Sequence, residues 1–90
     1  MADAVHPAAD AVRLFLVETT AAPDALLRVL SVFAGQQVAP ASVAFTSGPR
    51  CGSVRIEVQR LDAIRAERLS ARLQAAPAVR AVSLGWRAGG

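Results

Sequence analysis

Apolar residues repeat at two spacings along the chain, and these spacings predict strands and helices in alternation. Residues 12–17 (VRLFLV) are apolar on both faces except at Arg13, which is typical of a strand in the middle of a sheet. Residues 53–59 (SVRIEVQ) alternate between apolar and polar, which predicts a strand with one buried face. Its inward residues are expected to be Val54, Ile56 and Val58. Two further strands are predicted over residues 38–46 and 79–86.

Two of these predicted strands contain an irregular feature. Pro40 has no N–H to donate to a neighbouring strand, so the strand over residues 38–46 either starts irregularly or lies at a sheet edge. In the last strand, strict alternation places Val79 and Ala81 on one face and Val82 on the other.

The first predicted helix follows a break in the strand pattern at residues 18–22 (ETTAA). Pro23 suits the first position of a helix, and Asp24 suits its first turn, where a negative charge complements the helix dipole. The helix is expected to end near Gly35 or Gln37. Its apolar face is formed, at a spacing of three and four, by Leu26, Val29, Leu30 and Phe33.

The second predicted helix begins after Asp62, which can cap it, and ends before Pro77. Its buried stripe is expected to contain Ala66, Leu69, Leu73 and Ala76. Its exposed side carries the arginines Arg65, Arg68 and Arg72. We interpret these arginines as a solvated helix face, partly paired to Asp62 and Glu67; the alternative is a docking surface for an acidic partner.

The element order βαββαβ predicts an α+β, ferredoxin-like fold: a four-stranded antiparallel sheet with two helices on one face. The turn-rich residues 47–52 join the two middle strands. The opposite face of the sheet is expected to carry apolar groups, including Phe15 or its neighbours, that need a cover. We expect a disordered leader over residues 1–11, a single domain over residues 12–86 and a flexible tail over residues 87–90.

The composition narrows the classes of function. The single cysteine excludes a disulfide framework, and one cysteine with one histidine leaves no cluster for a metal, so we expect neither metal nor cofactor. No run of about 18 apolar residues exists, so no membrane span is expected, and the cytoplasm is the default compartment. Ten arginines and no lysine oppose seven acidic residues; the net charge of +3 is modest and is read as a solubility feature.

Four features of the sequence bear on other kinds of function. His6 lies in the leader and Cys51 has no base nearby in sequence, so no catalytic site is predicted. Residues 14–17 loosely resemble the first strand of an RNA-recognition module, but the third strand lacks the aromatic residues that stack on bases, so nucleic acid is not an expected partner. Trp86 is expected to be a lid over the edge of the core, with an interface anchor as the alternative.

Residues 14–84 resemble the ACT domain without gaps, and the short small regulatory subunit of acetohydroxyacid (acetolactate) synthase most of all. Residues 23–30 (PDALLRVL) resemble that subunit's Pro-Glu-x-Leu-x-Arg-Val-Leu at the start of its first helix. Residues 38–45 and 56–58 fit its second and third strands. The end of the domain fits at Leu73, Val79 and Val82.

This resemblance implies a non-catalytic, cytoplasmic subunit that forms a homodimer through its ACT domain. It would bind and activate the large, thiamine-diphosphate catalytic subunit of acetolactate synthase in branched-chain amino-acid biosynthesis. The alternative is a standalone ACT-domain protein that senses an amino acid.

The resemblance also implies a position for a small amino-acid effector, between the first loop of one copy and the second strand of the other. The positions that match are Thr20, Ala21, Ala22, Asp24 and Ala25 in the loop, with Val38 and Ala39 opposite. Valine-sensing members carry Asn and Gly at the positions where this chain has Ala21 and Asp24. The short form of the subunit has Asn before the proline, where this chain has Ala22. The glycine that the family has in the turn before its second strand is replaced here by Gln37. Losing one charge-assisted hydrogen bond costs about 1.5–3 kcal/mol, so valine sensitivity is expected to be weak or absent.

Overall fold

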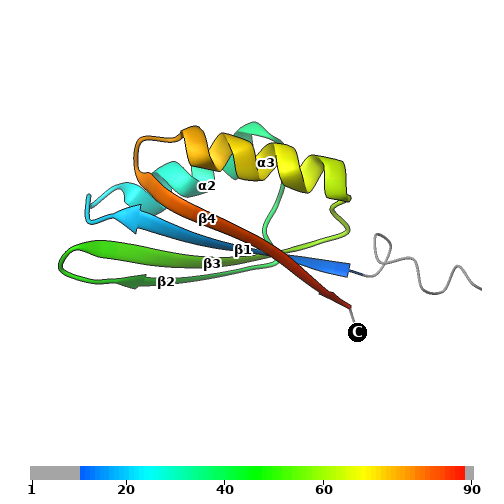
Figure 1. Ribbon diagram of the computed structural model, residues 1–90, viewed down its shortest axis with the longest axis horizontal. Coiled ribbons are helices and arrows are strands. Elements are labelled where there is room, and N and C mark those ends of the chain that lie inside the picture. Colours follow the sequence, from blue (N-terminus) through cyan, green and yellow to red (C-terminus); the bar gives the residue numbers. More distant parts are fainter. Residues whose placement is uncertain (1–10, 89–90) are drawn as a thin grey trace, which may run out of the picture.

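The four strands form one antiparallel sheet in the order β2-β3-β1-β4, and both helices lie on the same face of it (Figure 1). The computed structural model describes residues 11–88. The elements are β1 (Ala11–Thr20), α2 (Ala25–Gly35), β2 (Ser42–Ser47), β3 (Cys51–Gln59), α3 (Ala63–Ala75) and β4 (Val79–Ala88). This arrangement confirms the predicted ferredoxin-like fold. Neither helix within residues 11–88 is long and apolar enough to cross a membrane.

The strands differ from their predicted bounds at several ends. β1 does not break at Glu18 but continues to Thr20, because the start of β3 supplies ladder partners as far as Cys51. β2 begins at Ser42 rather than at residue 38, since Pro40 cannot donate to β3. β1 and β4 also run slightly beyond the expected domain limits of 12 and 86; the rest of the expected leader and tail lies outside the described residues.

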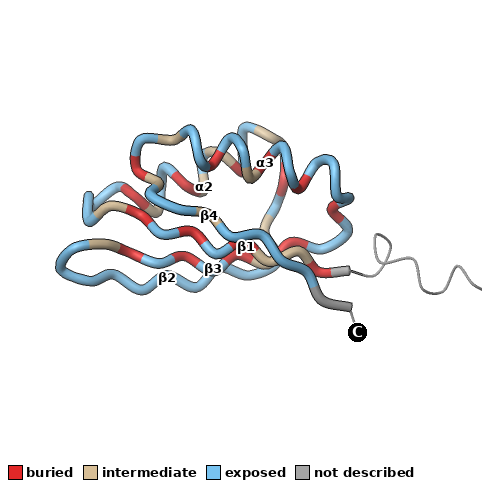
Figure 2. The backbone as a smooth tube through the Cα atoms, viewed as in Figure 1, coloured by how far each residue is buried: buried red, intermediate tan, exposed pale blue. Residues whose placement is uncertain are grey.

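The core lies between the sheet and the two helices, and alternation along the strands builds it. Figure 2 shows buried and exposed positions alternating along β3, whereas β2 is exposed throughout. The inward residues of β3 are Val54, Ile56 and Val58, as predicted. From α3, Ala66, Leu69 and Leu73 are buried as predicted, while Ala76 at the end of the helix is only half-buried.

Phe15 is fully buried on the helix-facing side of β1, and its ring meets that of Phe33 edge to face, with centroids 5.3 Å apart. The expectation that Phe15 belongs to the open face is therefore wrong. Strict alternation along β1 gives that face to its neighbours Leu14 and Leu16 instead, and Leu16 is exposed.

A β-bulge in β4 changes which residues of that strand face the core. Glu18 pairs with Ala81 and Thr19 pairs with Val79, so Arg80 has no partner in β1. Val79 and Val82 therefore both pack against the core, and the prediction that they lie on opposite faces is wrong.

Further along β4, Trp86 pairs with Arg13 on the helix-facing side of the sheet, and 52% of its surface is exposed. With half of its surface exposed, it does not form the expected lid over the core.

The end of α2 redirects the chain into β2 through a Schellman motif. Gln37 adopts a left-handed backbone with φ of 58°, its N–H donates to Ala34, and the N–H of Val38 donates to the carbonyl of Phe33 at 2.9 Å. Gln37 thus occupies, at a steric cost, the position that glycine fills most easily. Val38 is buried by this turn and contributes to the core.

The arginines of α3 are exposed, as predicted, but they do not form the expected ion pairs. The Asp62 carboxylate accepts the backbone N–H of Arg65 at 2.7 Å, which caps the helix. The ion pairs described, Asp24–Arg28 and Arg55–Glu57, do not include the arginines of α3, so the expected pairing with Asp62 and Glu67 is wrong. The Asp62 carboxylate is thus bonded to the backbone of Arg65 and not to an arginine side chain.

Candidate functional site

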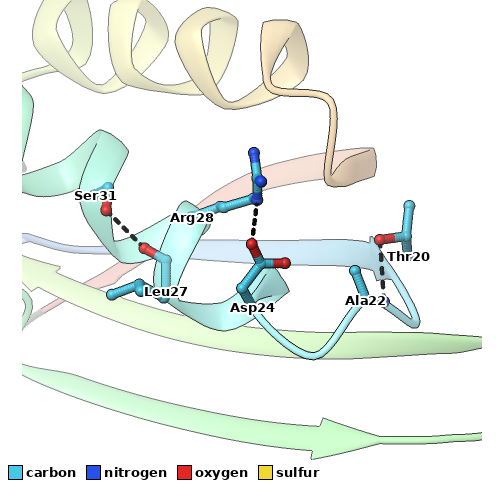
Figure 3. Close-up of polar contacts among 6 residues, drawn as sticks. All are labelled: Thr20, Ala22, Asp24, Leu27, Arg28 and Ser31. Atoms are coloured by element: carbon cyan, nitrogen blue, oxygen red, sulfur yellow. Dashed lines mark hydrogen bonds and ion pairs between the residues drawn. The ribbon is translucent and has the colours of Figure 1, made fainter.

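The loop between β1 and α2 lies beside the hairpin between β2 and β3, and the two enclose a cleft of about 280 Å³ that we call the hairpin cleft. It is lined by Thr20, Ala21, Ala22 and Pro23 from the loop, and by Phe45, Ser47, Gly48, Cys51 and Gly52 from the hairpin. The Thr20 N–H donates to the carbonyl of Ala78 at 2.9 Å, and the Thr20 hydroxyl oxygen accepts the N–H of Ala22 (Figure 3). These two bonds fix the start of the loop.

Gly52 makes the inner wall of the hairpin cleft possible. A Cβ atom at this position would lie 2.7 Å from Oγ1 of Thr19 and 2.9 Å from the ring of Phe45, both too close for a real side chain. The missing side chain lets the Phe45 ring lie over β3 next to the buried Thr19. The wall of the cleft therefore depends on glycine at this one position.

A second cleft, of about 540 Å³, lies between α2 and the segment that leads into β2; we call it the α2–β2 cleft. It is lined by Leu30, Phe33, Ala34, Gln37, Val38, Ala39, Pro40 and Val43. All of these residues except Gln37 are apolar. The cleft is therefore suited to burying apolar surface rather than to holding a charged group.

Five of the seven predicted effector residues line one or other of the two clefts. Thr20, Ala21 and Ala22 line the hairpin cleft, whereas Val38 and Ala39 line the α2–β2 cleft. The two groups do not share a cleft within one copy of the chain. The clefts do meet the same strand, because Val43 lines one and Phe45 lines the other.

The remaining two predicted residues, Asp24 and Ala25, line neither cleft. Ala25 is fully buried at the start of α2. The Asp24 carboxylate does not cap α2; it forms an ion pair with Nε of Arg28 at 2.8 Å, one helical turn away (Figure 3). The hydrogen bond from Arg28 lowers the pKa of Asp24 below its ordinary value of 3.8. Asp24 is thus ionised at neutral pH, with its charge opposed by Arg28.

The hairpin half of the cleft was not identified from the sequence. Phe45, Ser47, Cys51 and Gly52 reach the loop because β1 and β3 are paired in a register that places Thr20 opposite Cys51. Turn composition located the hairpin, but it carries no information about this register.

The free edge of the sheet runs along both clefts. The N–H of Gly48 donates to the carbonyl of Cys51, and the alternation of an antiparallel ladder then directs the backbone groups of Val43, Phe45 and Ser47 away from β3. Val43 and Phe45 are 41% and 40% exposed, and β2 contains no charged residue or proline. The edge lacks the features that usually prevent pairing with another strand.

Chemically, the two clefts are equipped to bind rather than to transform a ligand. The polar side chains that line them are those of Thr20, Ser47, Cys51 and Gln37, and none of the lining residues carries a charge. A charged ligand in either cleft would rely on backbone N–H and C=O groups for its hydrogen bonds.

A comparison with family models finds that the model described as ACT-like domain matches residues 6–87. No curated protein sequence matches the chain. The match to the family model extends over both helices, all four strands and both clefts.

Solved structures share the fold at low sequence identity. The ACT domain from GTP pyrophosphokinase of Chlorobium tepidum is 8% identical with a TM-score of 0.74, and the match covers 84% of this chain and 99% of that one. The C-terminal domain of the MgtC protein from Mycobacterium tuberculosis is 16% identical with a TM-score of 0.61, covering 90% and 89%. The regulatory subunit of aspartate kinase from Thermus thermophilus, in its ligand-free form, is 16% identical with a TM-score of 0.62, covering 86% of this chain and 51% of that one.

Proposed function

Because the chain belongs to the family of ACT-like domains, which are regulatory and generally non-catalytic, we propose that it is a regulatory subunit of acetolactate synthase. In this proposal it forms a homodimer and binds and activates the thiamine-diphosphate catalytic subunit in the cytoplasm. The observation that carries the regulatory role is the match to the ACT-like family over residues 6–87. The dimer is supported by the position of both clefts beside the free β2 edge. The resemblance of residues 23–30 to the short small subunit supports the choice of enzyme.

The proposed dimer joins the β2 edges of two copies. The outward backbone groups of Val43, Phe45 and Ser47 supply donors and acceptors for a β2 strand of a second copy running in the opposite direction. If the two-fold axis of the dimer passed next to Phe45, the backbone groups of all three residues would form hydrogen bonds between the two copies. The exposed side chains of Val43 and Phe45 would become buried at the same time, and burial of apolar area is the main favourable term in association.

The proposed effector is a small amino acid held at the seam between the copies. Pairing of the two edges brings the α2–β2 cleft of one copy, with Val38 and Ala39, near the hairpin cleft of the other, with Thr20, Ala21 and Ala22. The absence of charged side chains from the cleft linings supports weak or absent binding of valine.

The proposed action on the catalytic subunit is a shift between its conformations. A non-catalytic subunit activates an enzyme only if it binds the competent conformation more tightly than the incompetent one. Neither cleft needs to contain a catalytic group for this role.

The dimer is tested by light scattering coupled to size-exclusion chromatography. Wild-type protein is expected to show twice the mass of the chain, and Val43→Lys is expected to reduce it to that of a monomer, because the ammonium group would be buried at an apolar seam. Ser42→Lys is the matched control, since it adds the same charge to the open-face side of the same strand. A wild-type monomer, or equal effects of the two substitutions, would contradict the edge-to-edge dimer.

The regulatory role is tested by adding the chain to a purified acetolactate synthase catalytic subunit that lacks its small subunit. We expect a higher turnover rate and co-elution of the two chains. Titration calorimetry with valine is expected to show weak or no binding, and micromolar affinity would overturn that part of the proposal. No rise in turnover would argue against the acetolactate synthase assignment while leaving the family membership intact.

A second function, a standalone amino-acid sensor, is favoured by one observation. The hairpin cleft is complete within a single copy and offers the hydroxyl groups of Thr20 and Ser47 to a ligand. Mass spectrometry of the isolated protein under native conditions distinguishes the two functions: a retained small amino acid supports the sensor, and co-purification of a large thiamine-diphosphate enzyme supports the subunit.

A further inference from the structure

The net charge of the chain is concentrated around α3. Residues 60–80 contain five of the ten arginines and only two acidic residues. The rest of the chain contains five arginines and five acidic residues and is therefore neutral. The whole net charge of +3 thus belongs to α3 and the segments on either side of it.

Three exposed arginines, Arg65, Arg68 and Arg72, form what we call the arginine ridge. Their spacing of three and four places them along one flank of α3, next to the buried stripe that contains Leu69. At 1.5 Å per residue they span about 10 Å along the helix axis. Arg65 reaches the carbonyl of Gln36 at the end of α2, so the ridge follows the side of α3 that faces α2.

The groove beside the ridge has an apolar floor. Arg72 contributes to a cleft of about 320 Å³ between the two helices. The other residues that line this cleft are Val32, Gly35, Gln36, Ala75 and Ala76. A largely apolar cleft with one arginine of the ridge at its border suits a partner with both apolar and anionic side chains.

The ridge carries like charges that are not neutralised within the described part of the chain. The ion pairs described for residues 11–88 lie elsewhere, at Asp24–Arg28 and Arg55–Glu57, and none involves an arginine of the ridge. Like charges three or four residues apart destabilise a helix. Carboxylates from a partner would relieve this repulsion and accept hydrogen bonds from the planar guanidinium groups.

We propose that the arginine ridge is a docking surface for an acidic α-helix of a partner protein. A helix that carries carboxylates at the same spacing of three and four matches the ridge over its full length, because the two helices have the same rise per residue. The exposed Ile64, one turn before Arg68, offers an apolar contact at the same surface. No aromatic residue lies on α3 to stack against bases, so the surface fits a protein better than a nucleic acid. The proposal is independent of the proposed function, since the β2 edge is not involved.

The proposal is tested with a synthetic alanine-based helical peptide that carries glutamates along one face. The affinity of the whole chain for this peptide is measured by fluorescence anisotropy. The variant Arg65→Gln/Arg68→Gln/Arg72→Gln is expected to bind the peptide about tenfold more weakly than the wild type, because it loses the contributions of three exposed ion pairs. Amide shifts in a nuclear magnetic resonance titration of the wild type are expected to centre on α3. Binding is also expected to weaken as salt is raised.

The matched control is Arg28→Gln/Arg50→Gln/Arg55→Gln, which removes the same charge from other surfaces and is expected to change the affinity by less than about twofold. Equal losses in the two triple variants would overturn the proposal, because binding would then follow net charge alone. Tighter binding of a single-stranded RNA of equal charge at α3 would also overturn it, in favour of a nucleic-acid surface. Thermal melting of each variant checks that the fold is retained.

Discussion

The two helices cover the same face of the sheet, yet they present opposite kinds of surface to solvent. α2 leaves Leu27 66% exposed, and its one arginine, Arg28, is already paired with Asp24. α3 instead exposes the three unpaired arginines of the ridge. One layer of the fold therefore provides an apolar contact surface beside β2 and a charged one along α3, and the two can be disrupted separately.

The helices also differ at their N-termini, although an aspartate stands at the N-cap of each. Asp62 has an extended backbone, with φ of −72° and ψ of 166°, and its carboxylate reaches the N–H of Arg65. Asp24 has φ of −99° and ψ of 14°, makes no capping bond and pairs with Arg28 instead. Backbone conformation, and not residue type alone, therefore decides whether an aspartate caps a helix.

The largest expected effect on stability comes from the buried side chains that both helices contribute to the core. Phe33→Ala in α2 is expected to lower the free energy of unfolding by about 3–5 kcal/mol and Leu69→Ala in α3 by about 2–5 kcal/mol, because each leaves a cavity in the same core. Urea unfolding measures both. A loss below about 1 kcal/mol for either variant would show that its helix is not an equal part of the core; Phe33→Leu provides a milder variant if Phe33→Ala does not fold.

A smaller effect is expected at the caps. Asp62→Ala is expected to lower the free energy of unfolding by about 1 kcal/mol, because the N–H of Arg65 loses its acceptor. Asp24→Ala is expected to cost less, since no capping bond is lost. Chemical denaturation of the two variants at neutral pH measures the difference. Equal losses would remove the distinction between the two N-termini.

The smallest effect is expected in the pH dependence of Asp24→Asn. The pKa of Asp24 is lowered in the folded chain by the hydrogen bond from Arg28, so the pair stabilises the fold above about pH 4 and this contribution is lost as the pH falls through the lowered pKa. The wild type is therefore expected to melt slightly above Asp24→Asn at pH 7 and together with it in strong acid. Arg28→Gln should reproduce the pattern, and adding it to Asp24→Asn should cause little further change. A difference that persists in strong acid would show that the ion pair is not its source.

The spacing of apolar residues was sufficient to predict which side chains face the core wherever a helix or strand is regular along its whole length. Val54, Ile56 and Val58 face the core because β3 alternates without interruption. The facing of side chains along β4 was harder to predict, since the bulge depends on how β1 pairs with this strand and not on the sequence of β4 itself. The side assigned to Val79 relative to Val82 was wrong for this reason.

The candidate site could be predicted only in part. The loop residues Thr20, Ala21 and Ala22 followed from the family resemblance and do line a cleft. The opposite wall, with Phe45 and the others from the hairpin, is set by a strand register that local sequence does not specify. The Asp24–Arg28 pair was available from the sequence, because a spacing of four residues on a helix is a known signal for an ion pair.

The bulge in β4 has a consequence for how the length of this strand can vary. Arg80 is the residue without a partner in β1, so a chain that lacked it would keep Val79 opposite Thr19 and Ala81 opposite Glu18. Removing a residue nearer the middle of β4 would instead shift every later position by one and turn Val82 or Leu84 toward the other side of the sheet. Relatives one residue shorter at this point could therefore retain the same hydrophobic interior.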